Sequence, residues 1–227
     1  MKKTIALIIM LIIMLLTLTG CAQINYEVKV NKDGSGEISY TYGISKNVLQ
    51  QLNISAEDVI SSMKEQAEES SYIVEAYENE NVAGFKANKH VEDLSKDFSL
   101  QEAFGEEYVK DTEHNGINIE KGFLIIKYSQ NTQIDLTTMD EKQETIEMTY
   151  KIKLPAKVKT SNSNEISKNQ KELTWNLTAG KINKIEFVAE EINILSIAII
   201  LVIAVVIIVA ILIIIKLKKK HVTKKEN

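Results

Sequence analysis

The sequence contains no arginine: all 27 of its basic residues are lysine, in a chain of 227 residues. It also contains one cysteine, one proline and one tryptophan. A single cysteine excludes an intramolecular disulfide, so a folded domain here must be stabilised by its hydrophobic core alone. The formal net charge of −4 excludes the strongly basic class of nucleic-acid-binding proteins.

The charged residues are distributed unevenly along the chain. Residues 22–193 carry 19 lysines and 30 acidic residues, a net charge of −11, whereas the last twelve residues carry six lysines and one glutamate. Two long apolar segments enclose this acidic part. The pattern is typical of a membrane-tethered protein with an acidic domain outside the cell, and not of a cytosolic enzyme.

The amino-terminal segment has the features of a bacterial lipoprotein signal peptide. Two lysines precede an apolar run from Ile5 to Leu18, which has the length of a signal-peptide core and is too short to span a membrane comfortably. The run ends in Leu18-Thr19-Gly20-Cys21, which resembles a lipobox. We therefore expect residues 1–20 to be removed and the Cys21 thiol to accept a diacylglyceryl group. The alternative is an uncleaved signal anchor that merely ends at Cys21.

The carboxyl-terminal segment is predicted to be a transmembrane helix. Residues 194–215 include one polar side chain, that of Ser196. At about 1.5 Å per residue the segment spans roughly 33 Å, which is enough for the hydrocarbon core of a bilayer. Residues 216–227 form a lysine-rich tail. Because positive residues stay inside, we expect this tail in the cytoplasm and residues 22–193 outside.

Between these segments, residues 21–193 are predicted to form an α+β domain, either as one compact unit or as two small lobes. Period-two alternation of apolar and polar residues predicts a mostly antiparallel sheet of roughly eight strands, and two apolar stripes at helical spacing predict two helices. Thr160–Gln170 is polar and is predicted to be a loop. The expected strands are 24–30, 38–42, 72–77, 82–87, 123–128, 146–154, 173–177 and 185–189, and the expected helices are 55–70 and 91–98, the latter re-capped at Ser99 and continuing to Phe104.

The connectors to both anchors are short. Ala22 and Gln23 separate Cys21 from the first strand, and residues 190–192 separate the last strand from the apolar segment. We therefore expect strands 24–30 and 184–190 to lie side by side, at the end of the domain that faces the membrane.

Several short segments resemble the LppM-type family of bacterial membrane lipoproteins. The hairpin at 26–36 follows the lipobox cysteine, and Leu154-Pro155-Ala156-Lys157-Val158 and Leu173-Thr174-Trp175-Asn176-Leu177 follow later, before a last strand, one apolar helix and a basic tail. The resemblance covers the whole chain and implies a non-catalytic α+β domain, outside the cytoplasm, for which lipid or glycolipid binding has been proposed. These segments are structural, so no ligand-binding residue is carried over from the family.

No motif predicts an enzyme, a cofactor or a metal. Residues 31–38 mimic the start of an EF-hand calcium loop, but the position that requires a bidentate glutamate is Tyr42, and a β-turn explains the segment better. His90 and His114 have no second ligand at zinc spacing. The sequence has no nucleophile elbow and no glycine-rich phosphate loop. Trp175 lies in an alternating strand and is expected in the core.

Two functions therefore stay open. The domain is a binding module with an apolar groove for a lipid, glycolipid or other amphiphile, or it is a structural protein whose acidic surface docks a protein partner of the cell envelope. Glutamates at 65, 68, 69, 75, 78 and 80 indicate a solvated acidic face. In both cases the protein is held on the bacterial cell membrane by a lipid at Cys21 and by the apolar helix.

Overall fold

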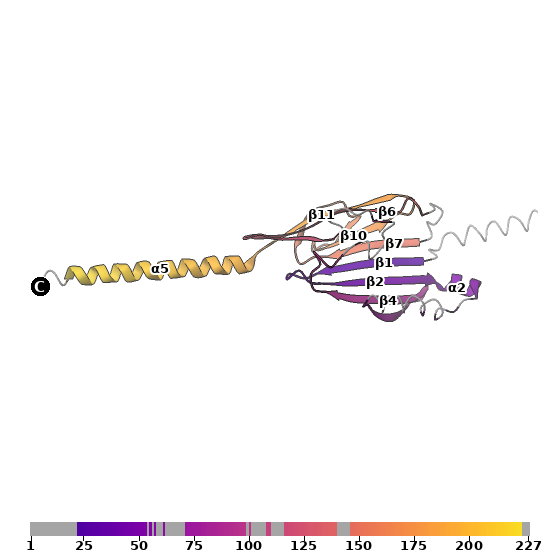
Figure 1. The fold of residues 1–227 in the computed structure, drawn as a ribbon, viewed down its shortest axis with the longest axis horizontal. Helices are drawn as coiled ribbons and strands as arrows, with labels where there is room; N and C mark the ends of the chain where they lie inside the picture. Colours follow the sequence, from indigo (N-terminus) through magenta and orange to yellow (C-terminus); the bar gives the residue numbers. More distant parts are fainter. Residues whose placement is uncertain are drawn as a thin grey trace, which may run out of the picture.

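Alternating apolar side chains give each of two β-sheets one hydrophobic face, and these two faces pack together in a sandwich (Figure 1). The structure is a computed structural model, and it describes residues 22–53, 55, 57, 61, 71–98, 100, 108–109, 116–139 and 146–223.

The larger sheet has seven strands in the order β3-β4-β2-β1-β7-β10-β9. Its neighbours are antiparallel except for β1 and β7, which run in parallel with Ala22 beside Ile146 and Lys29 beside Lys153. The strands are β1 (Ala22–Val30), β2 (Gly36–Ser45), β3 (Ile73–Glu78), β4 (Val82–Val91), β7 (Ile146–Lys153), β9 (Glu165–Ile166) and β10 (Glu172–Leu177).

The smaller sheet has four antiparallel strands in the order β5-β6-β11-β8. Its centre is a long ribbon in which β6 and β11 stay in register from Ile182 beside Asp135 to Ile192 beside Ile125. The strands are β5 (Asn118–Lys121), β6 (Ile125–Asp135), β8 (Lys157–Ser161) and β11 (Ile182–Ile192).

Large aromatic side chains fill the space between the sheets. Trp175 of β10 stacks on Tyr150 of β7, with 5.7 Å between ring centroids, and meets Phe187 of the opposite sheet at 6.2 Å. The buried Tyr150 hydroxyl donates a hydrogen bond across the sandwich to Gln130 Oε1 at 3.0 Å. The core position predicted for Trp175 is confirmed, and one continuous core joins the two sheets.

Two helices have described bounds. The short helix α2 (Lys46–Leu52) follows β2 directly, and the long helix α5 (Ile194–Thr223) follows β11 after one residue. Within α5, residues Ile194–Ile215 are long and apolar enough to cross a membrane. α5 extends away from the sandwich (Figure 1).

Most of the predicted strands are confirmed, and the sheet content is larger than expected. Eleven strands, in place of roughly eight, lie within the described residues, in two sheets. Part of the expected loop 160–170 is strand, because β8 continues to Ser161 and β9 pairs Ile166 with Leu173. The predicted strand at 123–128 begins only at Ile125 and continues to Asp135. Most of the helix expected at 55–70 lies outside the described residues.

The prediction of a helix at 91–98 is wrong. Val91 ends β4, and the next residues form a tight turn in which the Asp93 carboxylate accepts hydrogen bonds from the backbone N–H and the hydroxyl of Ser95. Leu94 N–H donates to Gly34 O, which places the Leu94 side chain in the core. The apolar spacing thus reflects a strand end and a turn that both reach one core. The re-capped continuation from Ser99 to Phe104 lies outside the described residues, apart from Leu100.

The prediction that the two terminal strands lie side by side is also wrong. β1 pairs with β2 and β7, whereas β11 pairs with β6 and β8 in the other sheet. Lys32, just beyond the end of β1, forms a 3.1 Å ion pair with Glu191 near the end of β11, so Ala22 at the start of β1 lies at the opposite end of the sandwich from α5 (Figure 1). At about 3.3 Å per residue, β1 separates the two ends by roughly 30 Å.

Candidate functional site

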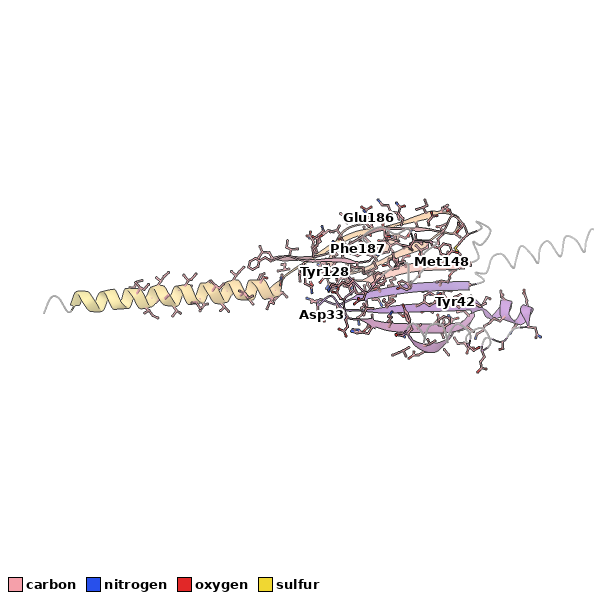
Figure 2. All side chains as sticks on the ribbon, viewed as in Figure 1. Asp33, Tyr42, Tyr128, Met148, Glu186 and Phe187 are labelled. Carbon is pink, nitrogen blue, oxygen red and sulfur yellow. The ribbon has the colours of Figure 1, made fainter. Side chains whose placement is uncertain are left out.

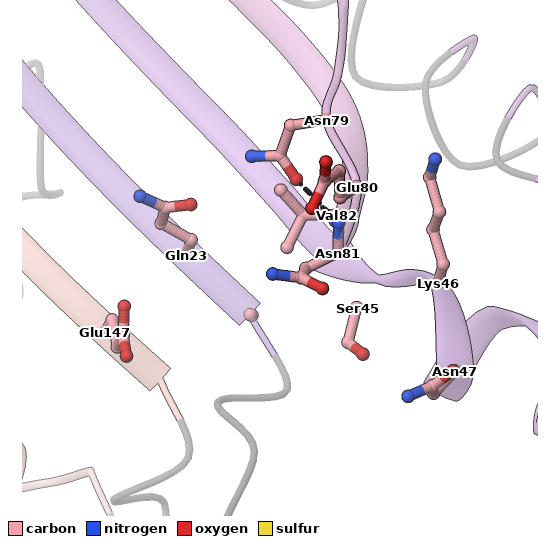
Figure 3. Close-up of a pocket in the computed structure, with 10 residues that line it drawn as sticks. Gln23, Ser45, Lys46, Asn47, Asn79, Glu80, Asn81, Val82 and Glu147 are labelled. Atoms are coloured by element: carbon pink, nitrogen blue, oxygen red, sulfur yellow. Dashed lines mark hydrogen bonds between the residues drawn. The ribbon is translucent and has the colours of Figure 1, made fainter.

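A polar pocket opens at the Ala22 end of the larger sheet, far from α5 (Figures 1 and 3). It has a volume of about 430 Å3, within the range of ligand sites. Four separate segments build its wall: the start of β1, the junction of β2 with α2, the β3–β4 turn, and the start of β7. The lining residues are Ala22, Gln23, Ser45, Lys46, Asn47, Asn79, Glu80, Asn81, Val82 and Glu147.

Asn79 organises the β3–β4 turn that forms one wall. Its side-chain Oδ1 accepts hydrogen bonds from the backbone N–H groups of Asn81 and Val82, each at 2.9 Å, as the close-up in Figure 3 shows. Its Nδ2 donates to the Tyr77 hydroxyl at 3.1 Å. Asparagine favours such turns because its short amide can satisfy nearby backbone groups. Asn79 is thus a structural residue of the pocket, with its hydrogen-bonding groups already in use.

The start of α2 is joined to the same turn. Lys46 N–H donates to Asn81 O at 2.9 Å, and Lys46 Nζ lies 2.7 Å from Glu78 Oε1. The hydrogen bond from Lys46 lowers the pKa of the Glu78 carboxyl. Ser45 occupies the N-cap position of α2, but its side chain makes no capping hydrogen bond. These contacts hold the start of α2 against the β3–β4 turn at the edge of the pocket, and they pair the Lys46 ammonium with Glu78.

The remaining polar side chains of the lining have unused hydrogen-bonding groups. The side chains of Gln23, Asn47, Glu80, Asn81 and Glu147 make no hydrogen bond or ion pair to another residue in the described part of the chain. Three amides and two carboxylates offer both donors and acceptors, which is the set that pairs with neighbouring hydroxyl groups. The lining includes neither a cysteine nor a histidine. This arrangement can bind a polar, uncharged molecule, and it differs from the apolar groove expected from the sequence.

No pattern in the sequence indicates this pocket. Gln23 and Glu147 lie side by side only because β1 and β7 pair in parallel, although 124 positions separate them in the chain. The asparagines at 79 and 81 are recognisable as turn residues, but turn residues alone do not indicate a binding site.

At the other end of the sandwich, charged groups connect the two sheets next to α5. Glu191 accepts a hydrogen bond from the Tyr128 hydroxyl at 2.9 Å and pairs with Lys32 of the β1–β2 turn. Burial, together with the Glu191 carboxylate, raises the pKa of the Tyr128 hydroxyl. Figure 2 places Asp33 and Tyr128 at this end, and Tyr42 and Met148 toward the pocket end. The contacts of Glu191 with Tyr128 and Lys32 thus connect the β1–β2 turn to the end of β11.

The segment that mimics a calcium loop is a hairpin turn. The Asp33 carboxylate accepts hydrogen bonds from the N–H and the hydroxyl of Ser35, at 3.0 and 2.7 Å, and these bonds lower the pKa of that carboxyl. Gly34 has a φ of +101°, which L-residues rarely adopt. The β-turn predicted here is therefore confirmed, with the aspartate used as a turn residue.

The other residues considered from the sequence do not join a site. His90 is on β4, with Nε2 3.7 Å from a Glu92 carboxylate oxygen, and His114 and Cys21 lie outside the described residues. Within the described ranges, no three His, Cys, Asp or Glu side chains gather closely enough to hold a metal ion. Lipidation of Cys21 stays a prediction.

Comparison with known proteins gives one family match. The model of a family described as "protein of unknown function (DUF3153)" matches residues 46–219, which is most of the chain. No curated protein matches the sequence significantly. Among solved structures, the NMR structure of the folded domain of Mycobacterium tuberculosis LppM is similar with a TM-score of 0.43 and 14% identity, over 77% of this chain and 91% of that domain. At this level neither fold nor function is inferred from the likeness, and membership of the LppM-type family stays a prediction.

Proposed function

We propose that this chain, which belongs to the DUF3153 family, is a non-catalytic lipoprotein of the bacterial cell envelope that binds the sugar headgroup of a glycolipid. One observation carries the proposal: the lining of the polar pocket includes Ala22, the residue that directly follows the expected lipidation site at Cys21. A lipid on Cys21 would hold the mouth of the pocket at the level of the membrane headgroups.

Two features of the chain support membrane attachment. Residues 18–21 have the composition of a lipobox after a signal-peptide core, and α5 contains 22 consecutive residues suited to a membrane span. The lysines that follow residue 215 favour a cytoplasmic tail, which would leave the sandwich and its pocket outside.

The chemistry of the pocket favours a sugar over a phosphate or an acyl chain. Glu80 and Glu147 place two carboxylates in the lining, whereas the one lysine, Lys46, is paired with Glu78. An anionic phosphate would therefore meet net negative charge. An acyl chain would leave the amides of Gln23, Asn47 and Asn81 without partners, which costs free energy when water is displaced. Sugar hydroxyls can donate to the carboxylates and accept from the amides.

Processing of the amino terminus gives the first test. We expect Cys21→Ala to block lipoprotein processing and leave a precursor about twenty residues longer, since the signal sequence before residue 21 would not be removed. The protein would stay in the membrane fraction through α5. The measurement is gel mobility together with incorporation of a labelled fatty acid. Equal mobility of the mutant and the parent, without label in either, would contradict the lipoprotein assignment.

The pocket gives the second test. The full chain, purified in mild detergent from its bacterial host, is expected to carry a glycolipid that native mass spectrometry and lipid extraction detect. The double substitution Gln23→Ala/Glu147→Ala removes one amide and one carboxylate from neighbouring strands. We expect the bound glycolipid to fall about tenfold, since the loss of two hydrogen bonds costs about 1.5 kcal/mol or more.

A matched control is Gln133→Ala/Glu165→Ala, which removes the same two side-chain types from exposed positions outside the pocket lining. It should retain the glycolipid. The alternative function, docking of a protein partner without a small-molecule ligand, predicts no co-purifying lipid in any of the three proteins. Equal glycolipid in the pocket variant and the control would also contradict the proposed site.

A further inference from the structure

The tip of the β5–β6 hairpin and the end of β11 that pairs with it expose a cluster of large apolar side chains. Phe123, Leu124, Ile125 and Ile192 are 64%, 52%, 49% and 62% exposed. We call these four residues the apolar tip. Outside α5, the described part of the chain exposes seven large apolar side chains in all, and the other three (Ile73, Ile166 and Ile182) lie in different strands. The apolar tip is thus the place where exposed apolar surface is concentrated.

Hydrogen bonds hold the apolar tip beside the first turn of α5. Asn193 N–H donates to Leu124 O at 2.9 Å, and Asn193 Nδ2 donates to Gly122 O at 3.1 Å. Asn193 O in turn accepts from Ile197 N–H in the first turn of the helix. A single residue therefore connects the turn of the hairpin to the start of the apolar segment, and Figure 1 shows the hairpin reaching the beginning of α5.

The hairpin is fixed in this position by the sheet. β6 and β11 are paired up to their last residues, where Ile125 lies beside Ile192. The apolar tip is therefore the rigid end of a continuous ribbon. Only one polar residue, Asn193, lies between the exposed Ile192 of the apolar tip and the exposed Ile194 and Leu195 of the helix.

We infer that the apolar tip inserts into the outer leaflet of the membrane, next to the point where α5 enters it. The inference rests on the proposed membrane attachment through α5. A lipid surface fits the apolar tip because the neighbouring helix is itself suited to a bilayer, so the same lipid layer that surrounds Ile194 and Leu195 reaches Phe123 and Leu124. Shallow burial of apolar side chains at the headgroup boundary is typical of peripheral membrane contacts.

Charged residues limit the depth of the insertion. Glu120 and Lys121 precede the turn, and Lys127 follows two positions after Ile125 on β6. Lys121 Nζ donates to Asp33 O at 2.6 Å, and Lys127 Nζ lies 3.9 Å from Glu120 Oε2. Because these charged groups must stay in water or among the headgroups, only the turn and the outermost pair of the ribbon enter the apolar layer.

Tryptophan fluorescence in vesicles tests the insertion on the full chain. Single substitutions place a tryptophan at Phe123, at Leu124, at Ala204 in the middle of the apolar segment, or at the exposed Asn131 further along β6. The parent protein gives the background of the buried Trp175. The vesicles are mixtures of phosphatidylcholine and phosphatidylglycerol, with acyl chains brominated either near the ester carbonyls or near the terminal methyl group.

We expect Phe123→Trp and Leu124→Trp to show blue-shifted emission and several-fold stronger quenching by the shallow bromines than Asn131→Trp. Ala204→Trp should be quenched by the deep bromines. Quenching at position 204 without quenching at positions 123 and 124 would overturn the inference and leave the anchor intact. A blue shift at 123 and 124 without bromine quenching would mean that protein, for example a second copy, covers the apolar tip, which would also overturn it. An unquenched position 204 would overturn both the membrane span and the insertion.

Discussion

Replacing Trp175 with alanine is expected to lower the free energy of unfolding by about 3–5 kcal/mol, the range for removing a large buried aromatic side chain. Trp175 is buried between the sheets and packs against Tyr150 on its own sheet and Phe187 on the other. Without its ring, the larger sheet loses its aromatic contact with Phe187 of the smaller sheet. Since the chain has one cysteine, no intramolecular disulfide can compensate for the loss.

A milder substitution separates packing from hydrogen bonding. Trp175 Nε1 donates to Asn162 Oδ1 at 2.8 Å, and that oxygen also accepts from Glu186 N–H at 2.9 Å. Trp175→Phe keeps an aromatic ring in the core and leaves Asn162 with its backbone partner, so we expect a loss of about 1–2 kcal/mol. Urea unfolding of the full chain in detergent, followed by near-ultraviolet circular dichroism of the tyrosines, measures both variants. Equal losses for the two variants would contradict the central packing role of the indole.

Replacing Gly84 with alanine is expected to cost about 3 kcal/mol, because an added Cβ would overlap the backbone of the neighbouring strand. That Cβ would lie 1.8 Å from Tyr42 O and 2.8 Å from Gly43 Cα. Gly84 of β4 is directly opposite Gly43 of β2, so the clash would force β4 away from the sheet. Because β3 is the edge strand of the sheet and pairs with β4, both strands would loosen together.

The facing glycine provides the matched control. A Cβ at Gly43 would meet its nearest neighbours, Cβ and Cγ2 of Val82, at 3.3 Å, which small side-chain shifts can relieve. We expect Gly43→Ala to cost at most about 1 kcal/mol. Hydrogen exchange of β3 and β4, together with the midpoint of urea unfolding, distinguishes the two variants. Equal protection and equal midpoints would show that the close approach of β2 and β4 is not needed for stability.

The strands could be predicted wherever a polar face and an apolar face alternate. Ile146 to Leu154 and Leu173 to Leu177 have that pattern, and both segments form central strands of the larger sheet. No alternating pattern predicts the second half of β6, because residues 129–133 are all polar, although Gln130 and Thr132 are buried. A buried polar residue with a partner across the core, such as Gln130 with Tyr150, has no signature in a hydrophobic pattern.

The arrangement of the strands and the pocket could not be predicted from local pattern. The parallel pairing of β1 with β7 joins residues more than a hundred positions apart, and this pairing places Glu147 beside Gln23. The predicted proximity of the terminal strands assumed that both ends of the domain face one membrane surface. The chain instead closes two separate sheets, so β1 and β11 share a core without sharing a hydrogen bond.

Ala22 and α5 lie at opposite ends of the sandwich, so the height of the pocket above the bilayer depends on the angle between the sandwich and the membrane-spanning helix. Asn193 is the only residue between β11 and α5. If β11 continues in the direction of a helix that stands upright in the membrane, the pocket lies roughly 30 Å above the headgroups, the length of a nine-residue strand. A lipid on Cys21 would be out of reach of the same leaflet in that posture. Attachment at both ends requires the ribbon to tilt at Asn193 until the sandwich lies along the membrane. Acylation of Cys21 would therefore change an upright domain, attached at one end, into one that lies flat and is attached to the same surface at two points.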